Sequence, residues 1–373
     1  CITYVFLCKM KQLATYYVFD QANTALAKVS KPIPPLKDGE ILVNIRYTTL
    51  CGSDLHTYCG LRNEPCPTIL GHEIVGVIAA ISSDHSGLDA RGNQLQIGDL
   101  ITWTVFSSDP NSANYQPEIP QKNDKIYKYG HRQITEMDDL HGGLATHIIL
   151  RPNTCIRVLP KDISPAVAAT INCAVATSAG ALRLAETITK KNIHVAGIGL
   201  LGLVSIAMCK EMGAKSIIAS DINPARLELA KKFGATATID LRETTSSTAL
   251  EATVIDRFID MSGSPEAMEL GIDTLGLHGN AVLVGAVFKQ RATGIDAEKV
   301  IRKMLTIKGL HNYNYTDFSV AVDFIIENWQ KYPFESLIER EFPLAEVNDA
   351  ISYALTHKPI RAGLFVHPST EQL

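Results

Sequence analysis

The stretch from Cys51 to Glu73 contains the residue types best suited to metal chemistry. A cysteine opens it, and His72 stands beside Glu73 at its end. Thiolate sulfur and imidazole nitrogen are ligands that a borderline-soft ion such as zinc prefers. Two ligands do not make a site, so a third donor has to come from another part of the chain. Further polar side chains lie between the two ends, at Ser53, Asp54 and His56.

A glycine-rich turn is the second chemical signal. The residues GIGLLG, from Gly197 to Gly202, follow a short apolar segment and precede a helical one, with Leu200 and Leu201 completing the loop. Such a turn brings a pyrophosphate to a helix N-terminus, where free N–H groups and the helix dipole favour anions. Gly197 permits the tight turn, Gly199 the close approach of a ligand, and Gly202 the close packing of helix on strand. The turn therefore predicts a dinucleotide site.

Asp221 indicates which dinucleotide is bound. It ends the next predicted strand, 19 positions after Gly202. Its carboxylate can accept hydrogen bonds from both hydroxyls of the adenosine ribose and would repel a 2′-phosphate, which favours NAD over NADP. Arg226 is close enough in sequence to weaken the exclusion of NADP.

Cys173 is the candidate third metal ligand. It lies just before the nucleotide-binding unit begins, where two domains should meet, so a metal there could face the nicotinamide. Three protein ligands and one open position are the catalytic arrangement of zinc, whereas four ligands close a structural site. A lone buried cysteine is by default part of a core. Ligation is therefore predicted from Cys51, His72 and Cys173 together.

Length and composition describe an ordinary globular chain. The 373 residues suggest two domains, and 46% are hydrophobic, 20% charged, with a net charge of −4. No block of Lys or Arg predicts binding to nucleic acid or to an anionic membrane, and no apolar run is long enough to span one. The eight scattered cysteines suggest reduced thiols in a cytoplasmic protein. Residues 1–9 have no features of a signal peptide, and Met10 is an alternative start.

The order of predicted elements suggests how these residues are positioned. Between residues 11 and 150 the chain predicts half-buried antiparallel strands, at Ala14–Phe19, Glu40–Arg46, Glu73–Ile81 and Leu100–Val105. From about Ser164 a helical segment, Ala166–Leu184, precedes alternating strands and helices, which indicate a parallel sheet covered on both faces. After about Gly309 short strands return, with one amphipathic helix near Phe318–Trp329. We therefore expect an α/β protein in which a doubly wound domain interrupts a β-rich one.

These motifs together resemble the zinc-dependent medium-chain alcohol dehydrogenases. The resemblance runs from about Lys11 to the C-terminus and includes CGSDLH from Cys51, the Gly71-His72-Glu73 triplet, Cys173 and the glycine loop with Asp221. It implies a GroES-like catalytic domain formed by residues 1–160 and 312–373, and a Rossmann NAD-binding domain formed by residues 161–311. Three segments also resemble a branch associated with phosphonate catabolism or cyclic alcohols: PTILGHEI from Pro67, KYGH at Lys128–His131, and GLHNY from Gly309.

The resemblance implies a role for each matching residue. Cys51, His72 and Cys173 correspond to the catalytic zinc ligands. Ser53 corresponds to the hydroxyl that takes the substrate proton, and His56 to the end of the relay to solvent. Asp54 corresponds to a carboxylate that orients a ligand histidine, and Glu73 to a carboxylate beside the metal that exchanges with its water. The implied reaction moves a hydride between a small-molecule alcohol and NAD, giving the aldehyde or ketone.

One departure from the family pattern concerns the metal count. Many members bind a second, structural zinc through four cysteines in a surface lobe, but the corresponding residues here, Ser107–Gln121, include no cysteine. We therefore expect one zinc per chain and a lobe held by ordinary packing, through Tyr115 and Ile119.

Several alternatives stay open at this stage. A zinc-free, NADPH-dependent quinone reductase has the same fold, and a redox-sensing regulator would use the exposed thiols. The primary, secondary, cyclic or polyol nature of the alcohol and the direction of the reaction are not readable from the sequence. His131 and His311 have no assigned role. The family resemblance suggests a homodimer or homotetramer assembled through an edge strand near Ala281–Gly285.

Overall fold

The computed structural model describes residues 12–243 and 253–366. Cys1, Cys8 and the question of residues 1–9 lie outside the described residues. The six described cysteines are all free of disulfide bonds, which agrees with the prediction of reduced thiols for that part of the chain.

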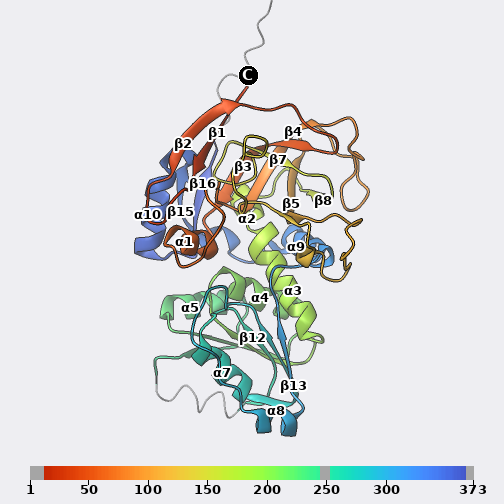
Figure 1. The fold of residues 1–373 in the computed structure, drawn as a ribbon. Coiled ribbons are helices and arrows are strands. Elements are labelled where there is room, and N and C mark those ends of the chain that lie inside the picture. Colours follow the sequence, from red (N-terminus) through yellow and green to blue (C-terminus); the bar gives the residue numbers. More distant parts are fainter. Residues whose placement is uncertain (1–11, 244–252, 367–373) are drawn as a thin grey trace, which may run out of the picture.

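The upper domain in Figure 1 is built on an eight-stranded sheet. Its main path runs β15-β16-β3-β4-β5-β6, while β7 pairs with β3 and β8 with β5. The strands are β3 (Ile41–Thr49), β4 (Glu73–Ile81), β5 (Leu100–Ser107), β6 (Tyr127–Lys128), β7 (His147–Leu150), β8 (Thr154–Val158), β15 (Ile338–Pro343) and β16 (Arg361–Phe365). A separate antiparallel pair consists of β1 (Leu13–Val18) and β2 (Ala27–Pro32). The four strands predicted between residues 11 and 150 are confirmed.

The C-terminal segment completes this domain. Strand β16 pairs antiparallel with β3, opposing Gly363 to Thr49. Three short elements connect to these strands: η3 (Phe334–Leu337), η4 (Leu344–Glu346) and α10 (Val347–His357). The pairing brings Arg361, at the start of β16, to the layer that carries Cys51 and Glu73, although it is 310 and 288 residues away from them in the sequence.

The lower domain is a parallel sheet of six strands in the order β11-β10-β9-β12-β13-β14. Its strands are β9 (Asn192–Ala196), β10 (Ser216–Asp221), β11 (Ala237–Asp240), β12 (Ile255–Asp260), β13 (Leu275–Leu283) and β14 (Thr306–Gly309). The strand order reverses between β9 and β12, and in such sheets ligands bind in the crevice at the carboxyl ends there. The predicted combination of a β-rich and a doubly wound domain is confirmed.

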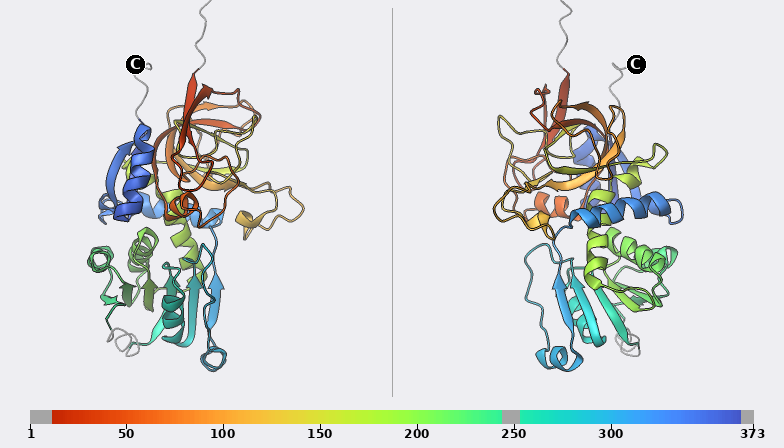
Figure 2. Two further views of the ribbon diagram at one scale, coloured as in Figure 1. Left: turned by 60° about the vertical axis from the view of Figure 1, so that its left-hand side comes forward. Right: turned by 90° about the vertical axis from the view of Figure 1, so that its right-hand side faces the viewer.

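Helices cover both faces of the parallel sheet (Figure 2). They are α3 (Ala176–Ala185), α4 (Leu200–Glu211), α5 (Pro224–Phe233), α7 (Pro265–Asp273) and α8 (Ala297–Lys303). One core cluster contains residues of α3, α4 and α5, and a separate cluster on the sheet includes Ala267 and Ile272 of α7. The first cluster continues through α9 (Tyr315–Asn328) to Phe106 of β5, so a single apolar core joins the two domains.

Two predictions about this region need correction. The helical segment Ala166–Leu184 is divided into α2 (Pro165–Ala168), a π-helical turn at Ile171–Val175 and α3. Strand β13 is flanked by β12 and β14, so the region Ala281–Gly285 is not an edge; among the described strands, β11 and β14 are the edges. The sequence suggested an edge because the short strand β14 carries little apolar signal of its own.

Within the described residues, one helical stretch, Pro165–Ala185, has the length and composition of a membrane span. Its most apolar window is 83% buried inside the protein, which is the environment of a core helix.

The lobe at Ser107–Gln121 is held mainly by hydrogen bonds. The Asn123 amide donates to Ser108 Oγ at 3.0 Å and to the Asp109 carbonyl at 2.9 Å, and the Asn314 amide donates to the Glu118 carbonyl at 3.2 Å. The predicted packing through Ile119 is wrong, because that side chain is 40% exposed. A polar loop can satisfy its carbonyls with side-chain amides and so needs less apolar burial.

Candidate active site

Three structural elements bring Cys51, His72 and Cys173 together. Cys51 is the N-cap of α1 (Gly52–Tyr58), His72 immediately precedes β4, and Cys173 lies in the π-helical turn before α3. One ligand atom from each lies within 4.8 Å of the other two. Cys51 and His72 are buried, and Cys173 is partly buried. Two soft sulfurs and one imidazole nitrogen are a donor set that fits zinc.

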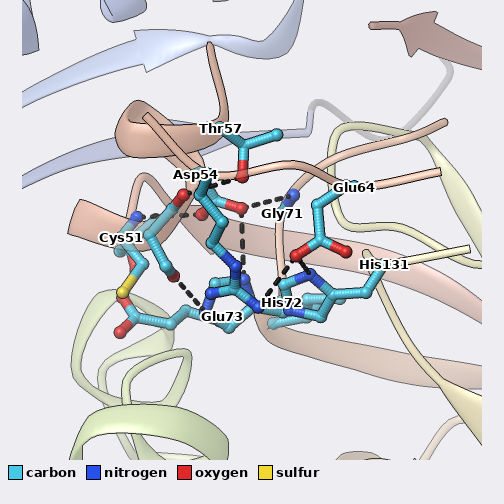
Figure 3. A network of polar contacts seen from close by, with 12 residues as sticks. Cys51, Asp54, Thr57, Glu64, Gly71, His72, Glu73 and His131 are labelled. Atoms are coloured by element: carbon cyan, nitrogen blue, oxygen red, sulfur yellow. Dashed lines mark hydrogen bonds and ion pairs between the residues drawn. The ribbon is translucent and has the colours of Figure 1, made fainter. Parts of the chain in front are cut away.

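Asp54 orients the histidine of this cluster (Figure 3). Its Oδ1 accepts hydrogen bonds from His72 Nδ1 and from the Gly71 N–H, each at 3.1 Å. Its Oδ2 accepts from the Cys51 N–H at 3.0 Å. Because the proton is then on Nδ1, the lone pair of Nε2 is free to bind a metal. Ser53 Oγ lies 3.3 Å from that Nε2, so its hydroxyl is adjacent to the donor set.

Glu73 is held by an arginine that the sequence motifs do not identify. Arg361 Nε and Nη2 each donate to the Glu73 carboxylate at 2.7 Å, and Thr49 Oγ1 donates to the same group. The Glu73 carboxylate is not among the clustered donor atoms. Arg361 is a lone residue in the last strand with no local motif, and only the pairing of β16 with β3 could have indicated it.

Arg361 also stabilises negative charge at the cluster. Its Nη2 lies 3.6 Å from Cys51 Sγ. A hydrogen bond from the Cys173 thiol, followed by the positive charge of Arg361, lowers the pKa of Cys51 well below its usual value. The same hydrogen bond raises the pKa of Cys173. The Cys51 thiolate is therefore stabilised before any metal binds, and a thiolate is the form that binds zinc.

His56 lies at the boundary between the domains. Its ring centroid is 4.6 Å from that of Phe288, which belongs to the loop after β13. Its Nδ1 is buried without a hydrogen-bond partner among the described residues. Burial lowers the pKa of His56, so the imidazole is neutral near pH 7 and able to accept a proton.

The glycine loop has the geometry that the sequence predicts. Gly197 has a φ of +87°, and a Cβ on Gly202 would lie 2.1 Å from the Gly197 carbonyl oxygen. By contrast, a Cβ on Gly199 would have no protein atom within 4 Å. Gly199 is the N-cap of α4, which begins at Leu200, so this space lies in front of a helix N-terminus. An anion can occupy it.

Asp221 and Arg226 adopt different positions around this loop. Asp221 ends β10, and its carboxylate accepts hydrogen bonds from the Ile198 N–H at 2.6 Å and the Asn223 N–H at 2.8 Å. Arg226 donates instead to the carbonyl of Lys358 at 3.2 Å, near the end of α10. Arg226 is therefore close to Asp221 in sequence, but its side chain is hydrogen-bonded to Lys358 instead.

A single cleft between the domains joins the two constellations. Its wall includes the three clustered donors together with residues of the glycine loop. The predicted residues that line it are Cys51, Ser53, His56, His72, Cys173, Gly199, Leu200, Leu201 and Gly202. A metal held by the three donors and a dinucleotide held by the loop would therefore share this cleft.

Comparisons with known proteins agree with this arrangement. Residues 37–161 match the family model for the alcohol dehydrogenase GroES-like domain, and residues 201–327 match the model for zinc-binding dehydrogenases. A D-arabitol-phosphate dehydrogenase from Enterococcus avium is 24% identical over 92% of this chain and 94% of its own length.

Solved structures show the same fold. An alcohol dehydrogenase from Thermotoga maritima superposes with a TM-score of 0.89 at 26% identity, over 95% of this chain and all of the other. A zinc-binding dehydrogenase from Sinorhizobium meliloti, solved with NADP bound, has a TM-score of 0.82 at 19% identity, over 95% of this chain and 99% of the other.

Proposed function

The chain belongs to the zinc-dependent medium-chain alcohol dehydrogenase family, and from this premise we propose that it is an NAD-dependent oxidoreductase with one catalytic zinc, acting on an alcohol or its carbonyl product. The observation that carries the proposal is the common cleft of the Cys51–His72–Cys173 cluster and the glycine loop. A redox-inert metal beside a nicotinamide suits hydride transfer to or from a polarised oxygen-bearing carbon.

The proposed roles follow from the contacts of each side chain. Cys51, His72 and Cys173 would hold zinc, and the bound ion would polarise the oxygen of an alcohol and lower its pKa. Ser53, whose Oγ is 3.3 Å from His72 Nε2, would take the substrate proton. His56 would pass that proton toward solvent, and its depressed pKa keeps it neutral and ready to accept. Asp54 would hold the His72 ring in position.

Glu73 has a positioning role in this proposal. Its pair with Arg361 keeps a cation next to Cys51, which stabilises the thiolate that binds the metal. The sequence resemblance instead implied an exchange of Glu73 with metal-bound water. The two hydrogen bonds from Arg361 oppose that movement, because both carboxylate oxygens are already engaged.

The preference for NAD rests on Asp221. A 2′-phosphate beside its carboxylate would meet like-charge repulsion, and Arg226, which is turned toward Lys358, does not offset it. The neighbour that binds NADP is only 19% identical and supports the fold alone.

The donor cluster disfavours the hypothesis of a zinc-free quinone reductase. Such an enzyme does not require two cysteines and a histidine whose ligand atoms lie within 4.8 Å of one another. A thiol-based redox regulator would need exposed thiols, and Cys51 is buried and Cys173 partly buried. A homodimer or homotetramer, a cytoplasmic location, the phosphonate or cyclic-alcohol branch and the domain limits at residues 160 and 311 stay predictions.

Activity of the zinc-loaded protein tests the proposal. NADH formation from NAD should be seen with at least one alcohol in a panel of polyols, cyclic alcohols and hydroxyalkylphosphonates. Cys51→Ala and His72→Ala should abolish turnover and leave NAD binding, measured by calorimetry, within about twofold, because the glycine loop is on the other domain. Full activity in either variant would contradict the zinc-dependent reaction.

A further inference from the structure

Cys173 belongs to a π-helical turn, Ile171–Val175, and not to a regular α-helix. The Ala176 N–H contacts the carbonyls of Cys173 and Ile171, three and five residues back. In an α-helix it would donate four residues back, to the carbonyl of Asn172. Single π-helical turns are rare and frequently occur at functional sites. The backbone of this candidate zinc ligand therefore needs support from outside the helix.

A tyrosine from a distant segment supplies such support. The hydroxyl of Tyr313 donates a hydrogen bond to the Asn172 carbonyl and accepts one from the Val105 N–H at 2.8 Å. Tyr313 lies in the loop between β14 and α9, directly before Asn314, the N-cap of that helix. One hydroxyl group therefore connects three parts of the fold: the π-helical turn, strand β5 and the loop that precedes α9.

The side chain of Asn172 connects the same turn to the segment of the histidine ligand. Its Oδ1 accepts a hydrogen bond from the Ile74 N–H at 3.2 Å. Ile74 is the second residue of β4, and His72 immediately precedes that strand. Asn172 itself immediately precedes Cys173 in the sequence. The residue before one sulfur ligand is therefore attached to the strand that follows the nitrogen ligand.

The core holds both side chains in place. Tyr313 and Asn172 are each 0% exposed. The Tyr313 ring packs against Phe106 of β5 and Phe318 of α9, with ring centroids 5.9 and 6.4 Å apart. Because a close-packed interior leaves a ring little freedom, the position of the Tyr313 hydroxyl is set by this strand and this helix. Burial also raises the pKa of Tyr313, which keeps its hydroxyl protonated and able to donate.

We propose that Tyr313 is a positioning residue for the metal site, because it holds the turn from which the Cys173 sulfur reaches the other two donors. The three ligand atoms lie within 4.8 Å of one another, so a small movement of the turn separates one sulfur from its partners. Within the described residues, the cleft wall does not include Tyr313, which therefore acts through Asn172 and not on the substrate. The inference rests on the proposed function, since it concerns the metal site of that same cleft.

The hydrogen bond of Tyr313 opposes a specific relaxation of the turn. Without that hydroxyl, the buried Asn172 carbonyl loses a donor, and a buried polar group without its partner is costly. The donor nearest in the helix is the Ala176 N–H, which would bind that carbonyl if the turn became α-helical. One residue corresponds to about 100° of rotation around an α-helix, so even part of this change turns the Cys173 side chain away from the other donors.

Tyr313→Phe tests the inference, because it removes the hydroxyl and keeps the ring. Its zinc affinity, measured by competition with a chromophoric chelator, should fall by roughly tenfold to a hundredfold, as is typical for the loss of a group that orients a metal ligand. In the cobalt-substituted protein, the sulfur-to-metal charge-transfer absorption per bound ion should also fall, because it reports how the thiolates bind. Equal zinc affinities in Tyr313→Phe and the unmodified protein would overturn the inference.

Tyr129→Phe is the matched control. Tyr129 is also 0% exposed, and its hydroxyl accepts a hydrogen bond from the Arg151 N–H at 2.8 Å and lies 2.6 Å from Thr154 Oγ1. These partners lie where β7 ends and β8 begins, outside the donor cluster. Both variants should lower the midpoint of urea unfolding of the metal-free protein, whereas Tyr129→Phe should keep its zinc affinity. An equal loss of zinc affinity in both variants would show an effect of overall stability and would overturn the inference.

Asn172→Ala tests the same turn through its other attachment. This change removes the hydrogen bond from the Ile74 N–H and leaves the Tyr313 hydroxyl in place. Zinc affinity should fall in this variant as well, because the turn is then no longer attached to β4. If Tyr313→Phe does not fold, Asn172→Ala decides by the same criterion, and full zinc affinity in it would overturn the inference.

Zinc binding needs no hydride transfer, so it separates the inference from the proposed function. If Tyr313→Phe binds zinc more weakly than the unmodified protein but no alcohol is oxidised, the proposed function fails and the inference stands. If alcohols are oxidised and Tyr313→Phe keeps full zinc affinity, the inference fails and the proposed function stands. An unmodified protein that binds no zinc would contradict both.

Discussion

Replacing Asp54 with asparagine should weaken metal binding without touching a metal ligand. Asp54 is only 2% exposed, and its two oxygens accept hydrogen bonds from three N–H groups, those of Cys51, Gly71 and His72 Nδ1. An asparagine has one oxygen and one NH₂ group, so one side of it must oppose a donor. Whichever way the amide turns, an interaction that orients a zinc ligand is lost.

The magnitude follows from the two possible orientations of the amide. If its oxygen faces Gly71 and His72, the NH₂ group opposes the Cys51 N–H, and a buried donor left without an acceptor costs about 1–3 kcal/mol. If the amide is turned the other way, its NH₂ group faces His72. His72 Nδ1 can then accept a hydrogen bond only if the imidazole proton moves to Nε2, which removes the lone pair that binds zinc. Loss of such an orienting carboxylate typically reduces metal affinity by roughly 10–100-fold.

Competition with a chromophoric chelator measures the zinc affinity of Asp54→Asn, and urea unfolding of the metal-free protein measures its stability. Asp317→Asn is the matched control. Asp317 is also 2% exposed and accepts hydrogen bonds from the Asn314 N–H and from Arg183, away from the cluster. The control should lower stability and leave zinc affinity within about twofold. Equal zinc affinities in Asp54→Asn and the unmodified protein would refute the orienting role of this carboxylate.

Two further predictions concern the cofactor. Gly202→Ala should lower the midpoint of urea unfolding, because the new Cβ would lie 2.1 Å from a carbonyl oxygen. Gly199→Ala should keep that midpoint but weaken NAD binding in calorimetry, because its Cβ would enter the space in front of the helix. The opposite pattern would contradict the assignment of the loop. Asp221→Asn should raise the ratio of kcat/KM with NADP to kcat/KM with NAD by roughly tenfold, because it removes a negative charge that repels the 2′-phosphate. An unchanged ratio would show that Asp221 does not select NAD.

Local signals in the sequence predicted much of this protein. The turn at Gly197–Gly202 combines steric requirements that only glycine meets, so its position at the start of a helix follows from residue type alone. Strand β4 was predicted with its observed limits, Glu73–Ile81, because its apolar residues are bounded by a glycine turn. The convergence of Cys173 with Cys51 and His72 was predicted from its place just before the nucleotide-binding unit and from the family resemblance.

Long-range contacts account for what was missed. The pair between Glu73 and Arg361 depends on β16 joining the first part of the chain, and no periodicity near Arg361 indicates it. The edge of the parallel sheet was misplaced because a strand as short as β14 has too few residues for a recognisable pattern.

Metal analysis combined with zinc X-ray absorption spectroscopy tests the central claim most directly. The protein purified without chelators should contain about one zinc ion per chain, bound by two sulfurs, one imidazole nitrogen and one lighter oxygen or nitrogen donor. Cys173→Ala should remove one sulfur from that shell or abolish zinc binding. A metal-free protein, a shell of four sulfurs, or a spectrum unchanged in Cys173→Ala would contradict a catalytic zinc at this cluster.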